Sequence, residues 1–151
     1  MLVEHPSPGE PDEVTQALAR FLVIRTCGHL EKTVQECCLT YVQNKSGGRV
    51  RQFSQSWLKR LDNPLPDRLL ELVGRFDASL VDDLSLLFEN NDGELKREMS
   101  LLIDKRNAIA HGGNEGIGSR KALDLLAYSR SLTDWFILNF DPRLEVSPSR
   151  T

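Results

Sequence analysis

Apolar residues recur at steps of three and four positions from Asp12 onward, and this spacing limits the folds that the chain can adopt. The pattern reaches Tyr41 without a break, and its period is that of one face of an α-helix. Its first half carries Val14, Leu18, Phe21 and Ile24. Asp12 is a suitable N-terminal cap, and the polar residues after Gln43 are suited to end the helix. The spacing therefore predicts one long first helix over residues 13–44.

Shorter helices are expected after this first one, because turn-forming and capping residues divide the rest of the chain. The expected caps are Ser46, Asn63, Asp92 and Ser119. The segments expected to be helical are 47–61, 64–76, 80–88, 93–110 and 120–140. No stretch alternates apolar and polar residues with the β-branched enrichment of a strand. The sequence therefore predicts an all-α fold, an antiparallel bundle of about five to six helices.

Length and composition are those of one globular domain, with 151 residues of which 40% are hydrophobic and 27% charged. We expect a proline-containing flexible leader over residues 1–12, a helical domain over 13–141 and a flexible tail over 142–151. No apolar run approaches the roughly 18 residues that a membrane span needs. The first residues also lack the basic-then-apolar order of a secretion signal. A cytoplasmic location and no membrane partner are therefore expected.

Charge and side-chain chemistry exclude several classes of site. The net charge of −3 argues against broad electrostatic coating of a nucleic acid, so any RNA contact has to be local. The candidate cations for such a contact, each of which also fits an ordinary solvated helix face, are Lys96, Arg97, Lys105, Arg106, Arg120, Lys121 and Arg130. The three cysteines lack C-x-x-C spacing, and the three histidines lack the spacing of helical metal ligands. Neither a metal ion nor another cofactor is expected.

Residues 105–112, Lys-Arg-Asn-Ala-Ile-Ala-His-Gly, form the densest group of chemically capable side chains. One interpretation is structural, because cations and a following glycine are common where a helix ends. A second interpretation is a catalytic or binding cluster. At about 100° per residue, Asn107 and His111 share one helical face, whereas Arg106 lies about 140° from His111. Arg106 must then reach around the helix or meet a histidine from another subunit.

The string Arg106-Asn-Ala-Ile-Ala-His111 resembles the R-x(4-6)-H motif of the HEPN superfamily. The long first helix with Gly28-His-Leu-Glu31, and Asn63-Pro64 before the next helices, are similar to the RiboL-PSP type of HEPN domain over about residues 13–140. The resemblance implies metal-independent RNA cleavage by a homodimer, often a toxin or an antiviral defence effector with an antitoxin partner. It also implies catalytic roles for Arg106 and His111, with Asn107 orienting the arginine or the phosphate.

Chemistry supports these roles independently of the resemblance. RNA can be cut when its own 2′-hydroxyl attacks the neighbouring phosphorus, a reaction that needs a base, an acid and positive charge. Histidine can take either proton role, and arginine can bind phosphate oxygens. One chain supplies a single histidine in this segment, so a two-fold dimer would supply both proton-transfer groups.

Two supporting residues and one rival function complete the hypothesis. Lys105 adds local positive charge, and Glu31 can orient His111 or Arg106 if close helix approach at Gly28 brings it near. An exposed acid is an equally good interpretation of Glu31. Trp57 and Trp135 fit apolar stripes and are expected in the core or at a dimer interface rather than stacked on bases. The rival function is a non-catalytic HEPN dimer that binds RNA, a nucleotide or a protein.

Overall fold

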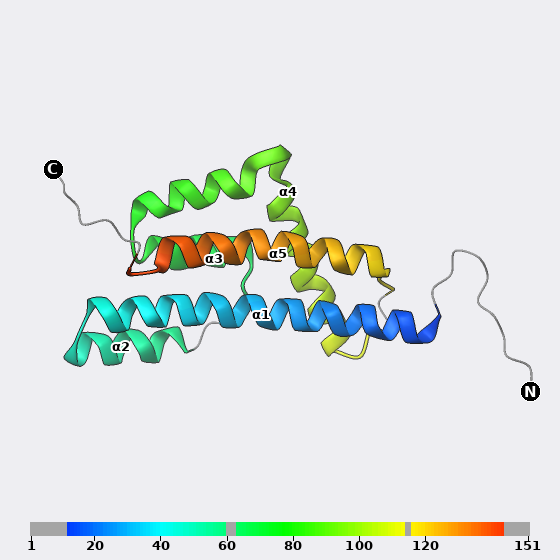
Figure 1. Cartoon of the computed structure of the whole chain (residues 1–151), viewed down its shortest axis with the longest axis horizontal. Helices are drawn as coiled ribbons and strands as arrows, with labels where there is room; N and C mark the ends of the chain where they lie inside the picture. Colours follow the sequence, from blue (N-terminus) through cyan, green and yellow to red (C-terminus); the bar gives the residue numbers. More distant parts are fainter. Residues whose placement is uncertain (1–11, 60–62, 114–115, 144–151) are drawn as a thin grey trace, which may run out of the picture.

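The structure, a computed structural model, describes residues 12–59, 63–113 and 116–143 and contains five α-helices and no strand within them (Figure 1). The helices are α1 (Glu13–Lys45), α2 (Gly48–Leu58), α3 (Pro66–Gly74), α4 (Ala78–Ala110) and α5 (Ser119–Phe140). The predicted all-α bundle with a long first helix is thereby confirmed. None of the described helices has the combined length and apolarity needed to cross a lipid bilayer.

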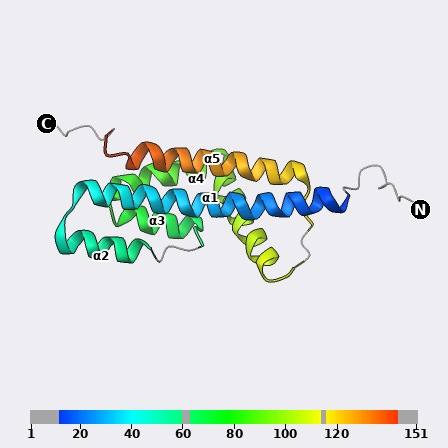
Figure 2. The same cartoon turned by 60° about the horizontal axis from the view of Figure 1, so that its bottom comes forward.

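The bundle is not antiparallel throughout. α2 turns back along α1, but α5 lies beside α1 and runs in the same direction (Figures 1 and 2). The intervening helices make this possible, because the kinked α4 carries the chain back toward the end at which α1 begins. The first and last helices, α1 and α5, can then lie side by side and run in the same direction.

The first helix begins as expected, since the Asp12 carboxylate accepts a hydrogen bond from the Thr15 backbone N–H at 2.6 Å. Its end departs from the prediction for Ser46, which does not cap α2. The Ser46 hydroxyl instead donates to the Val42 carbonyl in the last turn of α1, which also accepts a hydrogen bond from the Ser46 backbone N–H. Gly47 takes the N-cap position of α2 and forms no side-chain cap bond.

Two further predicted caps are wrong. Leu65 occupies the N-cap position of α3, with Pro66 in the first turn, whereas Asn63 lies outside the helix and its side chain points elsewhere. Gly118 occupies the N-cap position of α5, so Ser119 is the first helical residue rather than the cap. The predicted continuation of the second helix to Leu61 falls partly on residues 60–62, which lie outside the described part of the chain.

The predicted turn between two shorter helices appears as a kink within α4. Asn91, Asp92 and Gly93 have φ angles of 52°, 57° and 77°, so the chain leaves the helical region there for a few residues. Asp92 lies within the kink and does not cap the second arm; its carbonyl accepts a hydrogen bond from the Arg97 guanidinium. The second arm, residues 94–110, then crosses α5 and α1 steeply (Figure 1). This crossing places the end of α4 against α1.

A single core of aliphatic and aromatic side chains joins α1, α3, α4 and α5. Tyr41, Phe76 and Phe140 form an edge-to-face cluster with ring centroids 5.1–5.7 Å apart, which ties the end of α1 to the α3–α4 turn and the end of α5. Trp135 is buried, as predicted, and its indole N–H donates to Asp83 at 2.7 Å. These contacts fix the scaffold on which the α1–α4 crossing is built.

Candidate functional site at the crossing of α1 and α4

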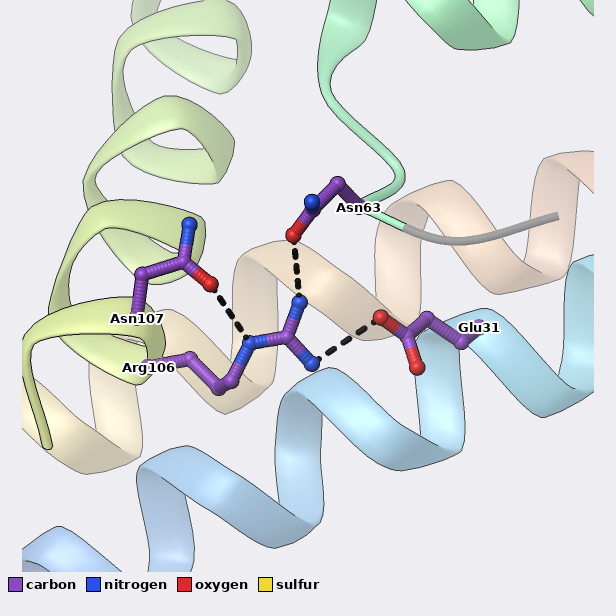
Figure 3. A network of polar contacts seen from close by, with 4 residues as sticks. All are labelled: Glu31, Asn63, Arg106 and Asn107. Atoms are coloured by element: carbon purple, nitrogen blue, oxygen red, sulfur yellow. Dashed lines mark hydrogen bonds and ion pairs between the residues drawn. The ribbon is translucent and has the colours of Figure 1, made fainter. Parts of the chain in front are cut away.

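The Arg106 guanidinium lies at the crossing of α4 with α1 and contacts three acceptors (Figure 3). Its Nη1 is 2.9 Å from Glu31 Oε1, its Nη2 is 2.8 Å from Asn63 Oδ1, and its Nε is 3.1 Å from Asn107 Oδ1. Only 19% of the Arg106 side chain and 27% of the Glu31 side chain are exposed. We call these four residues the arginine clamp. It joins α1, the segment before α3 and the last turns of α4.

Glu31 is therefore the ion-pair partner of Arg106, one of the two interpretations that the sequence left open. The expected means of bringing it there is wrong, however. Gly28 is exposed, and a Cβ added to it would meet no atom within 4 Å, so no close helix approach occurs at this glycine. The steep crossing of α4 over α1 brings the two charges together instead.

Asn63 is the clamp residue that sequence reasoning missed as a site residue. Its φ of 41° lies in the left-handed region, which asparagine adopts more readily than most residues with a side chain. That backbone conformation, just before Pro64, accompanies a side chain directed toward α4 rather than toward the start of α3. The signal in the sequence was an asparagine before a proline, and it also fitted a helix cap.

Cys27 lies one turn before Glu31 on α1 and feels both charges of the clamp. Burial raises the pKa of its thiol to about 11, the Arg106 charge lowers it, and the Glu31 charge raises it. A thiol with a raised pKa is a poor nucleophile at neutral pH. Cys27 is thus a packing residue, and its sulfur is not part of the candidate chemistry.

His111 occupies the C-cap position of α4 and is exposed. Its backbone N–H donates to Asn107, and the N–H groups of Gly112 and Gly113 donate to Ile109 and Ala108, so the expected capping chemistry is present. The His111 side chain makes no hydrogen bond with the described residues, and the structure does not join it to the arginine clamp. Within one chain, the Arg106 guanidinium is held in place while the imidazole faces solvent at the helix end.

The family model for RiboL-PSP-HEPN matches residues 2–136. The chain belongs to this family. The match spans most of the chain and confirms the family that the motif and helix pattern predicted. No curated protein and no solved structure gave a match to the chain. Membership supports a HEPN-type function in the broad sense, which is often RNA cleavage or RNA binding.

The other candidate cations of this HEPN domain are spread over α4 and α5. Several of them contact acceptors on neighbouring elements or turns: Lys96 contacts Asp67, Arg97 contacts the Asp92 carbonyl, Lys121 contacts Glu98 and Arg120 contacts Asp124. Lys105 is half-buried directly before Arg106. Among the described residues, no group of histidine, cysteine and acidic side chains is placed to hold a metal ion.

Proposed function

We propose that this HEPN domain is an endoribonuclease that cuts RNA without a metal ion, through attack of the RNA's own 2′-hydroxyl on the adjacent phosphorus. One observation carries the proposal: the arginine clamp holds a guanidinium on α4 five residues before an exposed histidine at the helix end. The guanidinium has five N–H donors, and the clamp uses three of them, on Nε, Nη1 and Nη2. One donor then remains on each Nη for a phosphate oxygen.

Each residue takes a defined role in this reaction. A histidine at position 111 accepts the proton of the 2′-hydroxyl as that oxygen bonds to phosphorus, and a second imidazole donates a proton to the departing 5′-oxygen. Arg106 stabilises the additional negative charge of the pentacoordinate transition state, Asn107 orients Arg106, and Lys105 adds positive charge nearby. The products are a 2′,3′-cyclic phosphate and a 5′-hydroxyl.

The need for two imidazoles leads us to propose a homodimer whose two copies of the site face one groove. A row of exposed apolar side chains on the first half of α1 supports this part of the proposal, with exposed fractions of 68%, 62%, 60% and 40% for Val14, Leu18, Phe21 and Ile24. A row of exposed apolar side chains along one helix is the kind of surface that can form a protein interface. α1 is also the helix that carries Glu31. In a dimer that pairs along α1, the interface helix of each chain would therefore also carry a residue of its arginine clamp.

The cellular role we propose is that of a toxin or defence effector whose activity is held in check by an antitoxin protein. Family membership supports this role, since unregulated RNA cleavage harms the cell that contains it. Induced expression of the wild type should arrest growth, and the His111→Ala variant should not. Equal growth in the two cultures would contradict the role.

The rival function is a HEPN dimer that binds RNA, a nucleotide or a protein without cleaving RNA, and one feature favours it. The Arg106 ion pair and the hydrogen bonds at the end of α4 are also what a purely structural helix end would contain. In this alternative, Arg106 stabilises the α1–α4 crossing and His111 only caps the helix.

The deciding experiment measures cleavage of a labelled RNA pool in EDTA. The wild type should cut RNA and leave 2′,3′-cyclic phosphate ends, and His111→Ala should remove the activity. His29→Ala is the matched control, because His29 is an exposed histidine on α1 for which no role is proposed. Mass measurement in solution should give a dimer for all three proteins. Wild-type protein that is dimeric, folded and inactive would favour the binding module.

A further inference from the structure

α2 presents its large apolar side chains to solvent rather than to the core. Leu58 is its buried residue, whereas Val50, Phe53 and Trp57 are 65%, 73% and 39% exposed. These three lie at steps of three and four and so share one face of the helix. Of the two predicted places for Trp57, the core and a dimer interface, its exposure excludes the core. A short helix that turns an aromatic face outward needs an explanation other than core packing.

Phe53 and Trp57 also line a pocket of about 270 Å³ between α2, the end of α1 and the α3–α4 turn. Val42, Ser54 and Leu58 line it with them, and Arg75 closes one side with its guanidinium carbon 4.9 Å from the centre of the Trp57 ring. The volume is just below the roughly 300 Å³ at which small-molecule sites begin, so it suits one flat ring system. No acidic side chain lines the pocket, although Arg75 pairs with Glu71 on α3 at 3.2 Å.

The charged side chains on α2 and at its two ends are all positive. Arg49, Arg51 and Lys59 are exposed, and residues 47–59 contain no aspartate or glutamate, although the chain as a whole has a net charge of −3. Arg51 also donates to the Ser46 carbonyl, which leaves its charge at this surface. Aromatic rings surrounded by cations are the combination that holds single-stranded nucleic acid, since bases stack on the rings and phosphates lie near the cations.

The end of α2 lies near the arginine clamp, while the pocket lies further along α1, because Val42 in its lining is eleven residues after Glu31, about 16 Å along the helix axis. α2 and the last turns of α4 emerge on the same side of α1 (Figure 2). The end of α2 is tied to α1 by a hydrogen bond of 3.3 Å from the Gln35 side chain to the Leu58 carbonyl. Gln35 is four residues after Glu31, a distance of about 6 Å along the helix axis. A strand seated on α2 can thus continue to the clamp.

We propose that α2 is a docking platform for single-stranded RNA, in which an unpaired base stacks in the pocket of Phe53 and Trp57 and the cations Arg49, Arg51, Lys59 and Arg75 hold the adjoining phosphates. This proposal deepens the proposed function, because it names unpaired RNA as the substrate class. The charge of α2 favours a polyanion over an apolar protein partner. Binding of RNA to α2 nevertheless does not require RNA cleavage, so experiments can reject the platform and the nuclease independently of each other.

The test is binding of a short fluorescent single-stranded oligonucleotide in which every 2′-hydroxyl is methylated, so that the nucleophile is blocked. Phe53→Ala should weaken binding by at least about fivefold, the lower end of what one stacking ring contributes. Leu86→Ala is the matched control, since Leu86 on α4 is 69% exposed and lies outside the platform. It should leave binding unchanged. Both side chains are exposed, so both variants should fold.

A charge variant gives a second readout. Arg49→Ala should weaken binding and lower the salt dependence by about 0.7 in the slope of log K against log salt, the value for one phosphate contact on a single strand. Arg120→Ala is its control, because Arg120 is 92% exposed on α5 and away from the platform. Equal salt slopes for the two variants would overturn the role of the cations.

Three results overturn the platform: no binding by the wild type, equal binding by the Phe53→Ala and Leu86→Ala variants, or loss of self-association in Phe53→Ala. The last result would make the face a protein interface. Binding that depends on Phe53 in a protein that cuts no RNA would support the platform and reject the nuclease. RNA cleavage by a protein that binds equally well with and without the Phe53 side chain would support the nuclease and reject the platform.

Discussion

Replacing Glu31 by alanine tests whether the arginine clamp is a structural unit of this HEPN domain. The Glu31–Arg106 pair has an N–O distance of 2.9 Å and is mostly shielded from water. Two unit charges about 4 Å apart at an effective dielectric constant of about 20 attract by about 4 kcal/mol. Desolvation cancels part of this attraction, and hydrogen bonds to charged groups contribute about 1.5–3 kcal/mol net. We expect Glu31→Ala to lower the free energy of unfolding by that amount.

Glu36→Ala on the same helix is the matched control. Glu36 pairs with Lys32 at 2.8 Å, but both side chains are more than half exposed, and such i,i+4 pairs contribute about 0.3–0.5 kcal/mol. Both substitutions place alanine in the interior of α1, so helix propensity changes equally. At about 2–4 °C per kcal/mol for a chain of this size, Glu31→Ala should lower the Tm by about 3–12 °C and Glu36→Ala by about 1–2 °C.

Thermal and urea unfolding of these two variants, together with Arg106→Gln and the Glu31→Ala/Arg106→Gln double variant, completes the test. In the double variant, the loss should be smaller than the sum of the single losses, because each single change already breaks the pair. Equal Tm values for Glu31→Ala and Glu36→Ala, or strict additivity in the cycle, would refute the clamp as a stabilising unit.

Three further predictions concern backbone geometry and pH. Asn63→Ala should be about 1 kcal/mol less stable to urea than Asn63→Gly, because both lose the Arg106 contact but only alanine strains a φ of 41°; equal stability would contradict this. Gly28→Ala should stabilise α1 by about 0.5–1 kcal/mol, since the site is open, and Gly93→Ala, at φ 77°, should destabilise. The Thr15 hydrogen bonds lower the pKa of Asp12 below 3.8, so its contribution is complete above that pH and is lost on further acidification. Wild type should therefore lose more Tm than Asp12→Asn below that pH.

The helices could be predicted from the sequence because the apolar period is a local property, whereas of the predicted N-terminal caps only the one for the first helix was right. Asp12 is that cap, and its carboxylate sits at the start of α1 as expected. The period does not tell which of two apolar faces is buried. On α1, small residues such as Ala19 and Val23 are buried, while Phe21 is exposed. Ala19 and Val23 suit close packing beside α5, and no local pattern distinguishes them from the outer row.

The candidate site could be predicted only in part. Asn107 follows Arg106 directly and its Oδ1 accepts a hydrogen bond from the Nε of Arg106, while its orienting role in catalysis stays a prediction. The sequence left two equal interpretations of Glu31, a partner of the motif residues or an exposed acid. It could not decide between them, because the position of Glu31 relative to Arg106 depends on how steeply α4 crosses α1. Asn63 could not be found as a clamp residue, since its role depends on a left-handed φ and on a helix 43 residues further along the chain.

The arginine clamp also determines which variants of this domain should change stability and which should change RNA cleavage alone. Its four residues come from three parts of the chain, so any change in it acts on the packing of α1 against α4 as well as on the guanidinium. His111 has no side-chain bond to the described residues, so its removal should leave that packing intact. If the site is catalytic, Glu31→Ala lowers Tm and cleavage together, whereas His111→Ala lowers cleavage alone. If the end of α4 is only a structural cap, neither variant changes cleavage, and Tm responds to Glu31→Ala as before. The pair of variants thus distinguishes a positioned catalytic arginine from a structural ion pair.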